Sequence, residues 1–298
     1  MEHTWEYQGT APVKIKKFLS SLGMGHRMFN DLKKVPGSLL VDGRSVRPTT
    51  KILPHQPLTV KMTPAAADPA IKVSMGPLAV LYEDENWLVV NKPAGIASMP
   101  GPTTGDDTLL NRIVGYLTAE HSPELRPHLM TRLDHDTSGV LLVAKHRVAT
   151  SMISSQVENH QLGKTYFALV TGSLSEDHGV IDAPIKRVGG QRARVVDPNG
   201  QPARTEYWVL DRSEQWTAVR VQLQTGRTHQ IRVHFAHLGH PLLGDQLYGQ
   251  PSKLINRQAL HASSIAFHDP FSQKEIKERA PLPDDLVRLV GPDFNSEG

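Results

Sequence analysis

The sequence has no cysteine among its 298 residues. A chain without cysteine forms no disulfide, carries no thiolate nucleophile and has no cysteine-ligated zinc. No segment reaches the roughly 18 consecutive apolar residues that a membrane-spanning helix needs. The start of the chain, M-E-H-T-W-E, lacks the basic residues and apolar run of a secretory signal. We therefore expect a cytoplasmic protein that does not contact a membrane.

A strong excess of one charge is also missing, because the formal net charge is only +3. The charges are nevertheless unevenly distributed: residues 11–62 hold ten lysines and arginines but only two acidic residues, Asp31 and Asp42. The rest of the chain is therefore mildly acidic. A basic segment joined to an acidic body favours nucleic acid as a partner over an ordinary solvated surface.

The length and patterning predict a small domain followed by a large one. Residues 12–63 contain two short helical patterns and a hairpin at Asp42-Gly43, a turn typical of two-residue hairpin loops. Residues 1–11 would form an extension before this domain, and residues 64–77, rich in proline and alanine, a linker. In residues 78–291 strand patterns outnumber helical ones without regular alternation, which predicts an α+β fold. Residues 292–298 are expected to be a disordered tail.

The most informative stretch covers residues 128–145. It contains Asp134, two residues after Arg132, then the small-residue turn T-S-G and an apolar run at 140–143. The run predicts a strand buried on both faces. A carboxylate at the mouth of a buried strand loses water and needs a counter-charge, for which Arg132 is one candidate. The alternative is a surface loop with a structural salt bridge.

The sequence R-L-D-x-x-T-S-G at 132–139 resembles the catalytic motif of the RluA-type RNA pseudouridine synthases. Three other segments resemble this family in the family's order: V-N-K-P-A-G at 90–95, K-T-Y at 164–166 and G-R-T-H-Q-I-R at 226–232. The chain departs from the pattern at Thr131, where the family usually has histidine. Residues 12–63 resemble, more loosely, the S-four-like RNA-binding module that often precedes this catalytic domain.

This resemblance implies a mixed, mainly antiparallel sheet and the isomerisation of specific uridines in structured RNA. Large-subunit ribosomal RNA is the first substrate class and transfer RNA the second. The resemblance implies a monomer with no cofactor and no metal. The reaction breaks the bond between ribose and the uracil nitrogen and rejoins the base through carbon 5. One carboxylate can add to the sugar carbon, stabilise it or take a neighbouring proton, and the sequence leaves these roles open.

The family's essential aspartate corresponds to Asp134. The resemblance implies that Arg227 supplies its counter-charge and that Tyr166 stacks on the uracil. It also suggests that Ile231 packs against the base. From the pattern alone, Tyr166 is a core aromatic before it is a stacking surface. A core role explains Ile231 equally well, and Arg227 is compatible with a structural salt bridge.

The target uridine must leave its stack before an enzyme can reach it. Similarity to the family suggests that Arg132, which is long and planar, fills the resulting gap. Lys145, Arg192 and Arg194 are candidate phosphate contacts, although exposed basic residues are often only solvated.

Three other functions compete with this one. The run His229, His234, His237 and His240 lacks the spacing of H-E-x-x-H and so disfavours a metal site. Ser138 lacks the G-x-S-x-G context of a serine hydrolase. A non-catalytic RNA-binding or ribosome-assembly protein would explain the basic segment and the changed residue 131. The presence of the aspartate, the tyrosine and the arginine argues against it.

Overall fold

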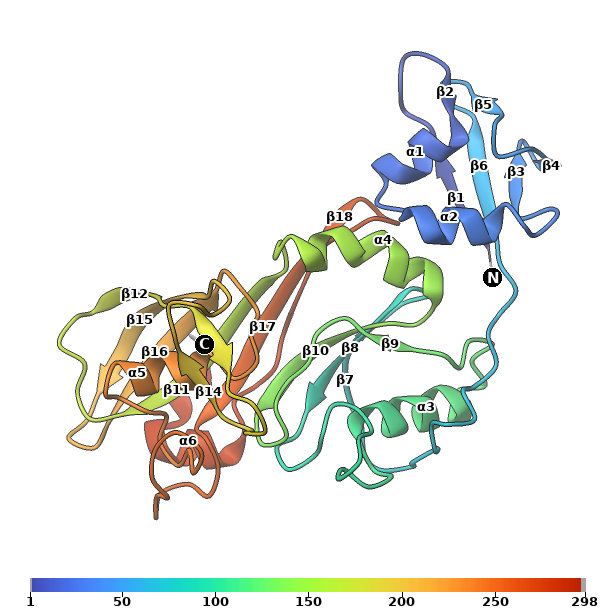
Figure 1. Cartoon of the computed structure of the whole chain (residues 1–298). Helices are drawn as coiled ribbons and strands as arrows, with labels where there is room; N and C mark the ends of the chain where they lie inside the picture. The colour runs from blue at the N-terminus through green and yellow to red at the C-terminus, as the bar shows by residue number, and fades with distance from the viewer. Residues whose placement is uncertain (1, 296–298) are drawn as a thin grey trace.

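The computed structural model describes residues 2–295, which form a small N-terminal module and a large domain (Figure 1). The N-terminal module, residues 2–61, has a four-stranded sheet in the order β1-β6-β3-β4. Its elements are β1 (Glu2–Glu6), β2 (Val13–Lys14), α1 (Ile15–Ser21), α2 (His26–Leu32), β3 (Leu39–Val41), β4 (Arg44–Ser45), β5 (Lys51–Ile52) and β6 (Pro57–Lys61). Because β1 pairs with β6 along its whole length, the first residues belong to this sheet and are not a separate extension.

The large domain is built on a ten-stranded sheet in which the order β12-β15-β16-β11-β17-β10-β8-β7 forms the main path. The pairs are antiparallel except for β10 with β17, which run parallel over two residue pairs. The sheet is therefore mixed and mainly antiparallel, as predicted. Its strands are β7 (Ala79–Glu83), β8 (Trp87–Lys92), β9 (His128–Leu129), β10 (Ser138–Ala144), β11 (Gly163–Thr171), β12 (His178–Asp182), β15 (Arg204–Arg212), β16 (Trp216–Leu223), β17 (Leu260–Asp269) and β18 (Lys274–Arg279).

Helices cover both faces of this sheet, and strand alternation decides which side chains each helix meets. In β10, Val140 and Leu142 pack toward α4 (Arg147–Glu158), whereas Leu141 and Val143 pack toward α3 (Leu109–Ala119). Every residue of β10 is buried, which confirms the prediction for residues 140–143.

The same alternation sets the environment of Tyr166 in β11. Tyr166 belongs to the cluster that includes α5 (Gln230–His237), whereas its neighbour Phe167 faces α6 (Asp284–Val290). The tyrosine therefore lies on the face of the sheet that carries α5.

Residues 62–78 contain no helix or strand and run beside α3 (Figure 1). The two parts of the chain nevertheless share one hydrophobic cluster. Trp5 stacks on Phe271 with 5.6 Å between ring centroids and donates from Nε1 to the Pro270 carbonyl. Arg147 of α4 forms an ion pair of 2.7 Å with Asp31 of α2. We refer to these contacts as the interdomain seam.

The end of the chain is more ordered than expected. Residues Pro292–Asn295 form a short 3₁₀ helix, and the Phe294 ring packs against Phe167. The predicted disordered tail is therefore wrong for residues 292–295, and residues 296–298 lie outside the described part. The longest helix between residues 2 and 295, α4, has 12 residues, too few for a membrane span.

We expect two buried histidines to make the protein less stable in acid. Burial lowers the pKa of His146 and of His261 to about 4. His146 caps α4 by accepting the Ala149 N–H at Nδ1, and His261 bonds to the Ser138 hydroxyl, so both side chains are held neutral. Unfolded histidine titrates near 6.5, so the unfolded state gains protons first as the pH falls from 6.5 to 4. Each histidine should then lower the free energy of unfolding by about 3 kcal/mol over this pH range.

Urea denaturation at several pH values between 7 and 4 measures this loss. His146→Asn keeps a capping acceptor but cannot titrate, and it should make the pH dependence shallower. The same steepness in this variant as in the parent protein would contradict a role for His146.

Candidate active site

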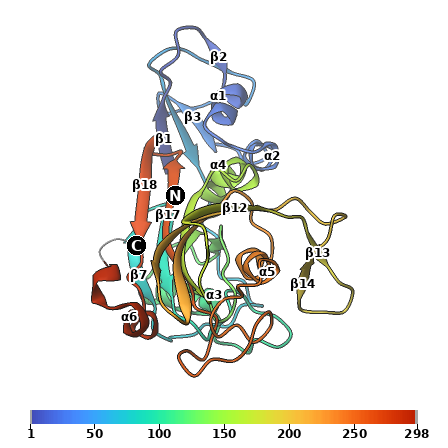
Figure 2. The ribbon, with the colours of Figure 1, turned by 90° about the vertical axis from the view of Figure 1, so that its left-hand side faces the viewer.

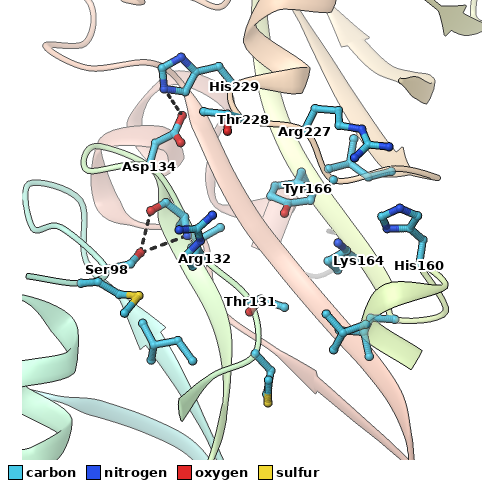
Figure 3. Close-up of a pocket in the computed structure, with 18 of the residues that line it drawn as sticks. Ser98, Thr131, Arg132, Asp134, His160, Lys164, Tyr166, Arg227, Thr228 and His229 are labelled. Atoms are coloured by element: carbon cyan, nitrogen blue, oxygen red, sulfur yellow. Dashed lines mark hydrogen bonds and ion pairs between the residues drawn. The ribbon is translucent and has the colours of Figure 1, made fainter. Parts of the chain in front are cut away.

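A cleft of about 670 Å³ opens where the two halves of the large sheet meet, a volume typical of ligand sites. Its walls come from the loop before β10, the end of α4, the start of β11 and the segment before α5 (Figure 3). Among the described residues that line it, Asp134 is the one carboxylate, and the basic side chains are Arg132, His160, Lys164, Arg227 and His229. The cleft therefore carries one acid among several bases.

The loop that carries Asp134 is fixed by two anchors. The buried Lys92 ammonium donates to the carbonyls of Pro93, Ile96 and His135 at 2.8–2.9 Å. The Ser98 hydroxyl donates to the Leu133 carbonyl at 2.7 Å and accepts the N–H of the same residue. These bonds clamp the residues on both sides of Asp134 and so fix where its carboxylate points.

Gly139 allows β10 to start directly behind this loop. Its φ of +115° is a conformation that other residues resist, and a Cβ atom here would collide with the Ala262 backbone of β17. A larger residue would push apart the parallel contact between β10 and β17, from which the Asp134 loop emerges.

The counter-charge of Asp134 comes from Arg232. Its Nη1 lies 3.0 Å from Asp134 Oδ2, and its Nε and Nη2 bind the fully buried Asp245 at 2.7 and 2.8 Å. Burial lowers the pKa of Arg232, but the hydrogen bonds and charges of the two aspartates outweigh burial and raise it. The arginine therefore stays charged between two carboxylates.

The prediction that Arg227 plays this role is wrong. Arg227 precedes α5 and donates from Nε to the Pro202 carbonyl at 3.0 Å, at the rim of the cleft. Arg232 lies on α5 itself, where the helix turns its side chain inward toward the sheet. Arg132, the other candidate, is exposed and has no ion-pair or hydrogen-bond partner among residues 2–295.

Tyr166 and Ile231 form the apolar side of the site. Tyr166 is 9% exposed and lines the cleft, while Ile231 is 4% exposed and borders the adjoining hollow next to Asp134. Burial raises the pKa of Tyr166, and the nearby Asp134 charge raises it further, so the phenol keeps its proton. Both residues belong to the core, and both border the space beside Asp134.

His229 is a site residue that the sequence offered only as one histidine in a run. Its Nε2 lies 3.8 Å from Asp134 Oδ2, and its Nδ1 bonds to the Tyr248 hydroxyl at 2.9 Å. Its φ of +58° is strained for a histidine, which indicates that tertiary contacts hold it beside the carboxylate. Within residues 2–295, no three His, Asp or Glu side chains are grouped to hold a metal ion.

The three candidate phosphate contacts lie in different places. Lys145 follows β10 at the end away from Asp134, about 20 Å along the strand, where it binds Glu83 at 2.7 Å. It is therefore not part of the cleft. Arg192 and Arg194 lie on the hairpin of β13 (Ile185–Arg187) and β14 (Arg194–Val196), and Arg194 lines a second hollow next to Arg227.

The hydroxyl of Thr131 has a structural partner, because it accepts the Leu142 N–H of β10 at 3.0 Å. Thr131→Val should leave this N–H unpaired and lower the free energy of unfolding by about 1 kcal/mol. Catalysis by the folded protein should change little, since the hydroxyl does not contact Asp134. Urea denaturation and rate measurements at saturating protein separate the two effects, and a large loss of rate would contradict this assignment.

A flat buried ring and one arginine-bound carboxylate in a basic cleft suit chemistry on the sugar or base of a nucleotide. Comparisons with known proteins agree with this class. A family model described as RNA pseudouridylate synthase matches residues 86–237.

The chain is 38% identical to the uncharacterized RNA pseudouridine synthase YjbO of Bacillus subtilis, over 93% of this chain and 98% of the relative. It is 37% identical to ribosomal large subunit pseudouridine synthase D of Xanthomonas campestris, over 85% and 80%. The solved structure of human RNA Pseudouridylate Synthase Domain Containing 1 matches with a TM-score of 0.60 and 26% identity, over 70% of this chain and 85% of that one. The chain belongs to the RNA pseudouridylate synthase family and is an RNA pseudouridine synthase.

Proposed function

We propose that this enzyme converts specific uridines of large-subunit ribosomal RNA to pseudouridine and that Asp134 is its single essential carboxylate. The observation that carries this proposal is the position of Asp134, the one acid among the described residues that line the cleft. The substrate class is supported by the printed name of the Xanthomonas campestris relative. We further propose that the enzyme works as a monomer in the cytoplasm.

The proposed reaction uses the site as follows. The target uridine leaves its stack and enters the cleft, where its base stacks on Tyr166. Asp134, paired with Arg232, then acts at the sugar carbon as the bond to the uracil nitrogen breaks. The guanidinium of Arg132, which has no partner among the described residues, occupies the gap in the RNA, a role that its planar shape suits.

We propose that the N-terminal module binds the same RNA. Its helices α1 and α2 lie on the same side of the molecule as α4, α5 and the β13–β14 hairpin (Figure 2). Eight exposed basic residues of the module have no carboxylate partner among the described residues; they are Lys14, Lys16, Lys17, Arg27, Lys33, Arg44, Arg47 and Lys51. Unpaired positive charges of this kind bind phosphates in a salt-dependent way.

Tritium release tests the proposed function. Ribosomal RNA is transcribed with uridine tritiated at carbon 5, the protein is added without metal or nucleotide, and the tritium released to water is counted. Release in a fixed ratio to RNA is expected, followed by mapping of the modified uridine. Transfer RNA serves as the second arm, and release from it alone would change the substrate class. Binding without release from either RNA would favour a non-catalytic role.

A further inference from the structure

A half-buried lysine in the cleft has no partner in the part of the chain that the structure describes. Lys164 lies on β11 and lines the cleft together with Tyr166. Its ammonium has no hydrogen bond or ion pair with any residue between 2 and 295. Lys92 shows what a structural lysine looks like in this protein, because its three donors are all taken by carbonyls. Lys164 therefore does not hold the fold together in the way that Lys92 does.

Two other basic side chains, those of His160 and Arg227, lie near Lys164. His160 has its pKa lowered by burial and by the positive charges of Lys164 and Arg227, which puts the three groups within electrostatic reach of each other. Figure 3 shows them on one side of Tyr166, with Asp134 on the other. A Cβ atom on Gly226 would lie 3.6 Å from Lys164 Nζ, so backbone without a side chain borders the ammonium.

This arrangement is costly without a ligand. Burial lowers the pKa of Lys164, and no carboxylate of residues 2–295 offsets the effect. The nearby Asp134 is already bound by Arg232. A desolvated cation without a partner destabilises a fold, and such sites often serve function at the expense of stability. The missing partner is an anion that arrives with the substrate.

We propose that Lys164, flanked by His160 and Arg227, binds the RNA phosphate next to the target uridine. This inference rests on the proposed function and adds a phosphate subsite to it. The base platform, Tyr166, and the ammonium face the same cleft from one strand, so a single nucleotide can contact both. The phosphate then fixes the sugar between Tyr166 and Asp134.

Lys164→Met is the direct test, because methionine keeps the length of the side chain and removes the charge. The loss of one charged hydrogen bond to phosphate should lower kcat/KM about 50-fold. The slope of log affinity against log salt should decrease by about 0.7, the value for one contact on a single strand. The thermal midpoint should stay equal or rise, since the buried charge is gone. Lys164→Arg should keep the salt slope.

The matched control is Lys274→Met, an exposed lysine of β18. The strand β18 lies on the side of the molecule away from α5 (Figure 2). The control makes the same change of charge and should alter neither kcat/KM nor the salt slope. A lower thermal midpoint for Lys164→Met with an unchanged slope would show a structural role and overturn the proposal.

A modified substrate identifies the phosphate. Stem-loops containing the mapped uridine are made with a neutral methylphosphonate on its 5′ or its 3′ side. One of the two should slow the parent enzyme as much as Lys164→Met does, and that variant should lose nothing further on the same RNA. Independent, multiplying losses would overturn the proposal. If the unmodified RNA releases no tritium, the proposed function fails, and the salt slope of binding still decides the phosphate contact.

Discussion

Replacing Asp134 by asparagine should lower tritium release by about 10⁴-fold or more, the range seen when a central catalytic group is removed. Asparagine has the same shape but no negative charge, so it can neither add to the sugar carbon nor stabilise a positive one. It is also too weak a base to take a proton. The loss is therefore expected whichever of these roles the carboxylate plays.

The fold should survive this change, because Arg232 keeps both of its bonds to Asp245. The matched control is Asp136→Asn, two residues further along the same loop, where the carboxylate is 46% exposed and binds His135. This control should stay within about twofold of the parent rate, as surface changes usually do. Equal losses in the two variants would point to damage of the loop and would contradict a catalytic role for Asp134.

Arg232→Met should produce the second-largest loss and separates the two arginines of the site. It leaves the buried Asp245 with only the N–H groups of Leu247 and Tyr248 and no counter-charge among the described residues. It also removes the counter-charge of Asp134. Breaking a buried ion pair from one side costs about 3–5 kcal/mol of stability, and the rate should fall about 10²–10³-fold, as after loss of a charge-stabilising group. Arg227→Met should lower the free energy of unfolding by less than about 1 kcal/mol, since within residues 2–295 the Arg227 side chain bonds only to a carbonyl at the rim.

A double variant tells stability and catalysis apart. Arg232→Met combined with Asp245→Asn removes the orphaned charge, so urea denaturation should show that much of the lost stability returns. Tritium release should remain low, because Asp134 still lacks its partner. Recovery of both properties would mean that Arg232 acts only on the fold. A larger loss of rate in Arg227→Met than in Arg232→Met would reverse the assignment.

Local pattern was sufficient for the strand behind the candidate site. The apolar run at 140–143 and the T-S-G turn predicted a buried strand behind the Asp134 loop because burial and strand alternation are local properties. Which arginine pairs with Asp134 is not local. Arg227 and Arg232 stand in one motif, and the choice depends on where α5 begins and which way its first turn faces.

Two further residues depend on packing between distant segments. Asp245 is fully buried and orients Arg232 from a loop beyond α5, yet in the sequence it is an ordinary aspartate of a glycine-containing turn. Lys145 lies outside the cleft for the opposite reason, since it is near Asp134 in sequence but a whole strand away in space. β1 was missed because its partner, β6, begins 51 residues after β1 ends.

The interdomain seam has a consequence for how the RNA is bound. Trp5 and Phe271 belong to one continuous hydrophobic cluster that spans the module and the large domain, so the seam resists a hinge motion that would close the protein on its substrate. The conformational entropy lost on complex formation must then be lost largely by the RNA, which has to adapt to two surfaces at a fixed separation. A prebent RNA would already have lost that freedom and would bind more tightly than a flexible one of the same sequence.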